Sequence, residues 1–325
     1  MILDAPSAKY ALIYESIHRE DNVLMVSELC RIAGVSRSGY YRWVNAMPAR
    51  EAREAKDRAD FDLILEAYRH RGYAKGARSI HMQLLHRNPP VTMNLKKIRR
   101  LMQKYSLSCP VRKANPYRRM AKALRTSNVA PNLLERNFKE YGPRMVLLTD
   151  ITYLPYNGVF AYLSTILDAF TKQVLAYAVS PSLEVDFVLE TVDMLTREHG
   201  TELKTQTLIH SDQGCHYTSY SFIELVKNSQ LRQSMSRRGN CWDNAPQESF
   251  FGHMKDKINI NGCTVFEEAK SIIDDWIDYY NNERYCWELA KLSPNEYYRF
   301  IVSGVYPLKV ENPPAIPDYS IPVNN

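Results

Sequence analysis

The chain has 325 residues, a formal net charge of +6 and the composition of an ordinary globular protein, which excludes a disordered or low-complexity chain. No apolar stretch of the sequence approaches the roughly 18–20 residues that a membrane span needs, and the first residues lack the regions of a signal peptide. Six scattered cysteines form no C-x-x-C pair, so we expect a reduced, cytoplasmic protein. The length of the chain predicts two or three domains.

The charge is distributed unevenly along the chain. Residues 67–134 hold 16 Lys and Arg and no Asp or Glu, whereas the segments before and after them are net acidic. Because cations that meet DNA phosphates release condensed counterions, a basic block of this length is typical of a nucleic-acid-binding surface. A solvated basic surface is the alternative, and the acidic motifs described below favour nucleic acid.

The N-terminal segment, residues 1–48, predicts helices. A helical stretch ends at Gly34, and the next helix begins with Ser36 as its cap. Helix, glycine turn and helix is the order of a helix-turn-helix. A plain helical hairpin that uses Tyr40, Tyr41 and Trp43 as core is the alternative, and this segment alone leaves both open.

A second, basic helical module is expected over residues 49–108. It opens with an exposed connecting helix of mixed charge and closes with a helix capped by Thr92 or Asn94. The outer face of this last helix would present four cations to a DNA groove or backbone. They are Lys96, Lys97, Arg99 and Arg100. Residues 109–134 predict an extended basic linker.

Residues 135–301 predict an α/β domain. Three apolar, β-branched runs separated by turns predict an antiparallel meander. The runs are residues 146–154, 160–168 and 174–179. Helices and strands then alternate, with a short strand at 232–235 and helices that begin near Asn244 and Phe266. This order indicates a mixed sheet with helices on both faces. We expect a C-terminal tail over residues 302–325.

Three carboxylates stand out by their positions. Asp150 and Asp212 each close an apolar run, so we expect them at strand ends, where side chains project into an open cleft; Glu248 follows on a helix. Carboxylates brought together repel one another, and Mg²⁺ or Mn²⁺ relieves that repulsion because hard cations prefer oxygen ligands. Two such ions would suit an in-line attack on a phosphodiester, with the three acids as catalytic metal ligands.

The helix that carries Glu248 has its own signals. Asn244 is a plausible cap, with Gln247 in the reciprocal capping position and Pro246 in the first turn, where no amide partner is lost. Lys255 lies two helical turns after Glu248 and therefore on the same face. We expect Lys255 to hold a DNA phosphate.

A zinc site is a weaker alternative. His210, Cys215 and His216 are possible ligands, but no second ligand pair follows at the spacing of a zinc finger. We expect His210 instead to orient the strand end beside Asp212.

The motifs around the three acids resemble those of the insertion sequence 3 family of transposases, which are related to retroviral integrases. The matching stretches are residues 149–153, 210–214, 217–219, 234–245, 248–251, 280–284 and 292–297. Residues 34–43 and the basic helical module also match the N-terminal part of that family. The 35 residues between Asp212 and Glu248 fit the family's spacing, and Lys255 fits its basic position. Lys257 departs from the acid that family members often carry there.

The resemblance implies a ribonuclease-H-like core in which Asp150, Asp212 and Glu248 hold two magnesium ions. It implies nicking at the ends of an insertion sequence and strand transfer from the freed 3′-hydroxyl, so the leading prediction is a DDE-type transposase. Arg237 and Arg238, within the matching motif, are further expected DNA contacts. A non-catalytic DNA-binding regulator of transposition and a general nuclease of the same fold are the alternatives.

The expected partners follow from the same resemblance. They are double-stranded DNA, both element ends and target, further copies of this chain on that DNA, and the upstream-frame protein of the same element, to which family members are often fused by frameshifting. We expect the protein in the cytoplasm, associated with the nucleoid.

Overall fold

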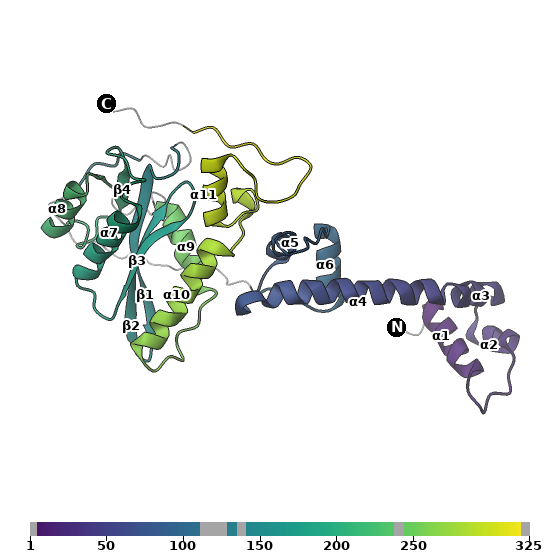
Figure 1. Cartoon of the computed structure of the whole chain (residues 1–325). Helices are drawn as coiled ribbons and strands as arrows, with labels where there is room; N and C mark the ends of the chain where they lie inside the picture. The colour runs from purple at the N-terminus through teal and green to yellow at the C-terminus, as the bar shows by residue number, and fades with distance from the viewer. Residues whose placement is uncertain (1–4, 111–128, 135–140, 237–243, 320–325) are drawn as a thin grey trace.

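The computed structural model describes residues 5–110, 129–134, 141–236 and 244–319 (Figure 1). Along the chain it shows a small N-terminal bundle of helices, a long helix that carries a second helical group, and a mixed α/β body. Most of the expected linker over 109–134 lies outside the described residues. In the described part, no helix combines the length and the apolar character needed to cross a bilayer.

The N-terminal bundle consists of α1 (Pro6–Ile17), α2 (Val26–Ala33) and α3 (Arg37–Asn45). After α2, Gly34 adopts a φ of 66°, in the left-handed region that favours glycine, and the Ser36 hydroxyl then accepts the N–H of Gly39 at the start of α3. The predicted helix, glycine turn and capped helix are confirmed. Tyr40 is buried but Tyr41 is 48% exposed, which favours a helix-turn-helix over a hairpin that buries both.

The second helical group consists of α4 (Met47–Arg69), the 3₁₀ turn η1 (His70–Gly72), α5 (Ala77–Leu85) and α6 (Leu95–Lys104). The connecting helix continues without a break into the helix that packs on α5 and α6, because no Gly or Pro follows Pro48 before its end. Its second half buries Phe61 and Ile64 against Ile98 of α6. Asn94 caps α6 by accepting the N–H of Lys96, as one of the two predicted caps.

The α/β body follows the predicted element order. Its strands are β1 (Val146–Tyr156), β2 (Val159–Asp168), β3 (Val174–Ser180), β4 (Leu208–Ser211) and β5 (Arg232–Met235). Its helices are α7 (Asp186–His199), α8 (Tyr220–Asn228), α9 (Ala245–Lys255), α10 (Phe266–Asn282) and α11 (Pro294–Ser303), with η3 (Trp287–Leu289) before α11. The sequence reasoning missed α11, although Ser293 and Glu296 form a capping box around Pro294, a readable start signal.

The strands form one sheet in the order β3-β2-β1-β4-β5, with β1, β2 and β3 antiparallel and β4 and β5 parallel to β1. Helices α9 and α10 cover one face, where Phe250 packs in the same core as Leu148. Helices α7 and α8 cover the other face, where Phe222 packs in the same core as Leu147. This layering and strand order are those of a ribonuclease-H-like fold, as predicted.

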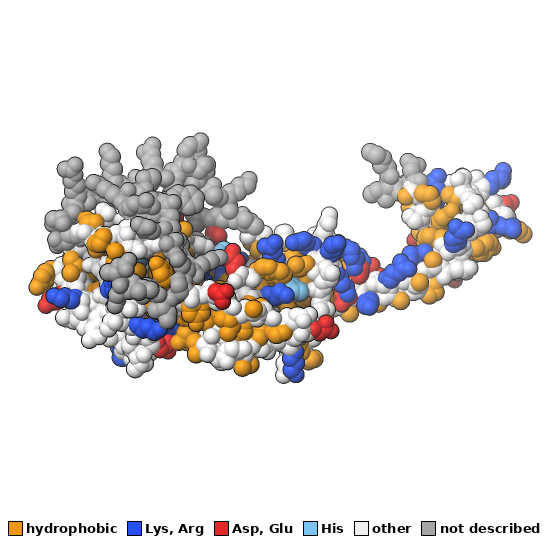
Figure 2. Space-filling view, turned by 90° about the horizontal axis from the view of Figure 1, so that it is seen from above, with side chains coloured by type: hydrophobic (Ala, Val, Ile, Leu, Met, Phe, Trp, Pro, Cys, Tyr) orange, Lys and Arg blue, Asp and Glu red, His pale blue; other side chains and the backbone are white. Residues whose placement is uncertain are grey.

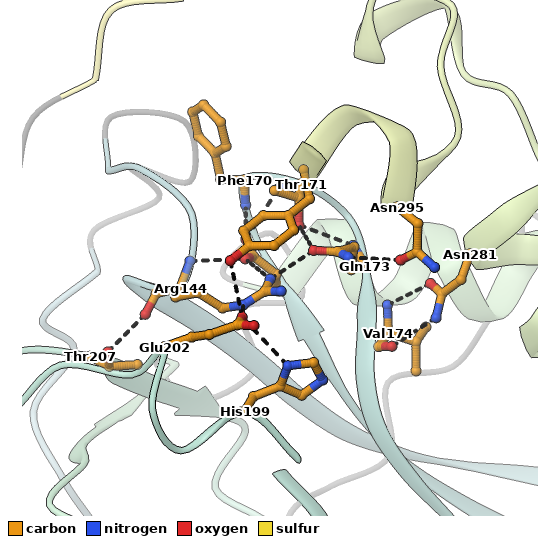
Figure 3. Close-up of polar contacts among 12 residues, drawn as sticks. Arg144, Phe170, Thr171, Gln173, Val174, His199, Glu202, Thr207, Asn281 and Asn295 are labelled. Atoms are coloured by element: carbon orange, nitrogen blue, oxygen red, sulfur yellow. Dashed lines mark hydrogen bonds and ion pairs between the residues drawn. The ribbon is translucent and has the colours of Figure 1, made fainter. Parts of the chain in front are cut away.

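A buried ion pair joins the beginning of β1 to the end of β2 (Figure 3). Arg144 Nη1 lies 2.9 Å from Asp168 Oδ2, and both side chains are almost fully buried. The carboxylate of Asp168 also accepts the backbone N–H groups of Phe170 and Thr171, and Arg144 Nε donates to Glu202 at 2.6 Å. Every charge of this group therefore has a partner, as burial requires.

The same network reaches two further elements of the body (Figure 3). Thr207, just before β4, donates its hydroxyl to the carbonyl of Arg144 at 2.7 Å. Gln173 accepts from Arg144 and donates to Asn295 at the start of α11, while the Arg144 guanidinium lies 4.0 Å from the ring centre of Tyr298. Arg144 thus links the beginning of β1 to β4 through its carbonyl and to α11 through its guanidinium.

The second helical group docks on α10 through one arginine. Arg71, with φ of 56°, pairs with Asp275 and Asp278 of α10, both at 2.8 Å, and also with Glu283 just beyond that helix. Tyr73 donates its hydroxyl to Asp275 at 2.9 Å. These contacts hold part of the basic block against an acidic helix.

We predict that Asp168→Asn lowers the free energy of unfolding by about 3–5 kcal/mol, because it removes the fully buried counter-charge of Arg144 and leaves only the partly exposed Glu202 to balance that guanidinium. The measurement is urea unfolding of the full chain. The matched control is Asp62→Asn, which breaks an exposed i,i+4 pair with Arg58 and should cost about 0–0.5 kcal/mol. Equal losses in the two variants would contradict the assigned importance of the buried pair.

Candidate active site

The register of two parallel strands brings Asp150 and Asp212 together. The last registered pair between β1 and β4 is Leu148 with His210. Asp150 and Asp212 each lie two residues beyond that pair, and parallel strands advance together, so the two acids are neighbours at this point. The expectation that Asp150 ends a strand is wrong. It lies within β1, which continues beside β2 opposite Thr165, and only β4 ends here.

The two acids also face the same side of the sheet. Residues alternate between faces, and Leu148 on β1 and Leu208 on β4 both pack in the core under α9 and α10. Counting by twos from these residues puts Asp150 and Asp212 on that face. The helix that carries Glu248 therefore covers the face from which both acids project.

Helix α9 is fixed against β2 by Gln247. Its side-chain amide donates to the hydroxyl of Thr165, the residue opposite Asp150 in the sheet. The predicted reciprocal cap is therefore wrong: Asn244 occupies the N-cap position, but its side chain makes no capping hydrogen bond, and Gln247 faces the sheet. The predicted proline in the first turn is confirmed. The buried bond to Thr165 holds α9, and with it Glu248, near β1.

The pKa of Asp150 responds to both other acids and to Lys255. Burial, the negative charge of Asp212 and that of Glu248 raise the pKa of Asp150 to about 7, against the backbone N–H of Ile151 and the cation of Lys255. Burial likewise raises the pKa of Asp212. Carboxylates that are partly withdrawn from water beside another negative charge favour a proton or a cation.

Asp212 is oriented by the loop after β4. Its Oδ1 accepts the N–H of Gly214 at 2.8 Å. A Cβ on Gly214 would lie 2.9 Å from the same oxygen, closer than real Cβ contacts, so only glycine allows this approach. Sequence reasoning included Gly214 in a motif but did not give it this role. The signal in the sequence was the position of Gly214 two residues after Asp212, in the turn that follows the strand.

The histidines near Asp212 are held by hydrogen bonds. His210 is fully buried and its Nδ1 lies 2.9 Å from the hydroxyl of Ser234 on β5, in keeping with a role in ordering the end of β4. His216 Nε2 lies 2.8 Å from the carbonyl oxygen of Leu183. The two rings are thus engaged by different elements.

The donor set fits a hard divalent cation. Among the described residues, no three carboxylate, imidazole or thiol side chains already form a metal-binding group. Asp150 and Asp212 nevertheless supply oxygen ligands whose raised pKa values come from burial, and Glu248 adds to the negative field. Magnesium or manganese prefers such oxygen ligands and would remove the repulsion among them.

The predicted DNA contacts on α6 separate into two pairs. Lys97 and Arg100 form ion pairs with Asp60 and Asp57 of α4, which lie in the acidic segment before the basic block. Lys96 and Arg99 are exposed and form no ion pair with a described residue. Lys97 and Arg100 are thus engaged by acids of α4, which packs beside α6, and contact of the four cations with DNA stays a prediction.

The basic face of the second helical group is visible in Figure 2, where Lys and Arg side chains gather over it and along the long helix. Lys257, the departure from the family pattern, donates to the carbonyl of Ala74 at 2.5 Å and so joins the segment just after α9 to this group. Arg237 and Arg238 lie outside the described residues.

Comparison with known proteins agrees with this architecture. Family models described as integrase core domain match residues 140–241 and 229–294, and one described as HTH-like domain matches residues 54–115. The putative transposase InsK for insertion sequence element IS150 of Escherichia coli is 32% identical over 273 residues, which cover 84% of this chain and 93% of that protein. The chain belongs to the insertion sequence 3 family of transposases.

Two further relatives are matched over nearly their whole length. The insertion element IS600 uncharacterized 31 kDa protein of Shigella sonnei is 30% identical, with 82% of this chain and 96% of that protein covered. Transposase InsF for insertion sequence IS3A of Escherichia coli is 26% identical, with 87% and 97% covered. The chain is thus a transposase with an integrase core, a DDE-type polynucleotidyl transferase that acts on DNA.

We predict that Asp150→Asn stabilises the metal-free transposase at pH 8 by about 1–3 kcal/mol, a value reduced for the partial exposure of this side chain. Because the pKa of Asp150 is higher in the folded than in the unfolded chain, the folded protein loses stability as the pH rises from about 4 to about 7. The gain should therefore shrink at pH 5. Urea unfolding in EDTA at both pH values measures it, and an equal effect at both would contradict the raised pKa.

Proposed function

We propose that the transposase cleaves DNA at the ends of its insertion sequence and joins the freed 3′-hydroxyl to target DNA through Asp150, Asp212 and Glu248. The observation that carries the proposal is the β1–β4 register, which makes Asp150 and Asp212 neighbours under the helix that bears Glu248. The electrostatic effect of Glu248 and Lys255 on Asp150 supports a shared site.

In this proposal Asp150, Asp212 and Glu248 would hold magnesium or manganese, two ions in all, and the metal would supply Lewis-acid activation of the attacking oxygen and charge stabilisation at the leaving oxygen. The chain's own groups orient the ligands. Ile151 and Gly214 donate backbone N–H groups to one carboxylate oxygen of Asp150 and of Asp212, which orients both side chains. Lys255, exposed on α9, would hold a phosphate of the strand being cut.

The proposed DNA surface extends from this site to the second helical group. Lys96 and Arg99 would contact the backbone of the element end, and Lys97 and Arg100 would have to exchange their carboxylate partners for phosphates. We include Arg237 and Arg238 as further contacts. The proposed partners are double-stranded DNA, further copies of the chain assembled on it, and the upstream-frame protein of the element, all at the nucleoid in the cytoplasm.

Asp212→Asn and Glu248→Gln should each abolish magnesium-dependent strand cleavage, to the level of a reaction in EDTA, because each removes a ligand charge without changing side-chain size. The assay uses a duplex with the terminal sequence of the element that encodes the chain. Binding of that duplex should be retained. Cleavage that persists in either variant would exclude the triad, and a wild-type chain that binds but never cleaves would favour a non-catalytic regulator.

Gly214→Ala should lower cleavage at least tenfold while leaving DNA binding intact, because the new Cβ displaces the Asp212 carboxylate by contact at 2.9 Å. The matched control is Gly252→Ala within α9, where no atom lies within 4 Å of the added Cβ. That change should slightly stabilise the helix and leave cleavage unchanged. Equal activity in the two variants would show that Asp212 does not need this orientation.

A further inference from the structure

A large cavity separates the second helical group from the α/β body. Its volume is about 1210 Å³, above the roughly 300–1000 Å³ of small-molecule sites. It lies between α5, which supplies Arg78, and the segment from α9 to η3, which supplies His253, Arg284 and Trp287. The cavity is thus bounded by the helical group on one side and by the helix that carries Glu248 on another.

Two guanidinium groups, those of Arg284 and Arg78, line the cavity together with one carboxylate, Glu288. Arg284 is partly buried, and its Nη1 donates to the sulfur of Cys286, while its guanidinium lies 5.3 Å from the ring centre of Tyr280. Neither Arg284 nor Arg78 forms an ion pair with any residue that the structure describes, in contrast to Arg71. A guanidinium shielded from water without a counter-charge is costly, and a phosphate would satisfy it with paired hydrogen bonds.

The indole ring of Trp287 lies beside these cations. Trp287 is 43% exposed, unusual for so large an apolar side chain. The Arg78 guanidinium lies 5.7 Å and the Lys291 ammonium 5.2 Å from its ring centre, and the His81 ring centre lies 6.1 Å away. An exposed aromatic face surrounded by cations is the combination that holds single-stranded nucleic acid, by stacking a base and neutralising its phosphates.

The position of the cavity relates it to the proposed active site. Ser249 and His253 line it from α9, and Glu248 is the residue next to Ser249 on the same helix. A DNA strand that leaves the acidic face could therefore pass around α9 into the cavity. A base paired inside a duplex cannot stack on Trp287, because its neighbours in the stack cover both of its faces.

We propose that this cavity binds an unpaired nucleotide of the DNA strand, with its phosphate on Arg284 and Arg78 and its base stacked on Trp287. The inference rests on the proposed function only in taking DNA as the substrate. It assigns a subsite for single-stranded DNA that is separate from the three carboxylates.

The test measures binding of a fluorescent single-stranded oligothymidylate to the full chain in EDTA, by anisotropy at several salt concentrations. Trp287→Ala should weaken binding about tenfold or more, and Trp287→Phe should retain most of the affinity because it keeps an aromatic face. Arg284→Gln and Arg78→Gln should each reduce the slope of log affinity against log salt by about 0.7. A blunt duplex should bind Trp287→Ala as it binds the wild type.

The matched control for charge is Arg197→Gln, an exposed arginine on α7 paired with Glu198. It should leave single-strand affinity unchanged. Crosslinking with a 5-iodouracil oligonucleotide gives a second readout on the unaltered chain and should mark the peptide that contains Trp287. If Trp287→Ala and Arg284→Gln bind like Arg197→Gln and the crosslink falls elsewhere, the cavity is only a gap between packed domains and the proposal is overturned.

The outcomes separate this inference from the proposed function, because the binding assay contains no metal and needs no cleavage. If Trp287→Ala binds the single strand as tightly as the wild type while Asp212→Asn still abolishes cleavage, the subsite alone is overturned. A Trp287 crosslink together with cleavage that survives Asp212→Asn would overturn the triad alone.

Discussion

The buried ion pair between Arg144 and Asp168 is the interaction on which the position of the acidic site depends. It joins the start of β1 to the end of β2, and the carbonyl of Arg144 holds Thr207 immediately before β4. Because β4 is short, this anchor determines where β4 lies beside β1. That register in turn makes Asp150 and Asp212 neighbours, so a structural ion pair at one end of the strands sets the geometry of the carboxylates further along them.

The acidic site itself works against the stability of the fold. Asp150 is held on a covered face beside Asp212 and under Glu248, and the rise in its pKa measures the cost of that placement. Backbone N–H groups and the exposed Lys255 offset only part of it. A group of carboxylates that the protein leaves incompletely neutralised is suited to a cation, which is the reason to connect the electrostatics of this site with metal-dependent chemistry.

The basic block has two uses in the folded chain. Some of its cations hold the modules together: Arg71 is bound by acids on and just after α10, and Lys97 and Arg100 are bound by acids on α4. Others, including Arg78 and Arg99, have no carboxylate partner among the described residues. The net basicity of the segment therefore overstates the charge available to DNA, and the described cations without a carboxylate partner include Arg99 on α6 and Arg78 beside the cavity.

Much of this protein follows from local sequence. Alternation predicted the meander, helical spacing and caps such as Ser36 and Asn94 predicted the helices, and the motifs around the acids predicted the family, because periodicity and capping depend on residues a few positions apart. Only the tertiary structure decided that Asp150 lies within a continuing strand, that Gln247 bonds Thr165 instead of capping its helix, and which cations are neutralised. Each of these depends on a partner distant in sequence, and a residue's chemistry gives its possible partners without saying which one the packing brings within reach.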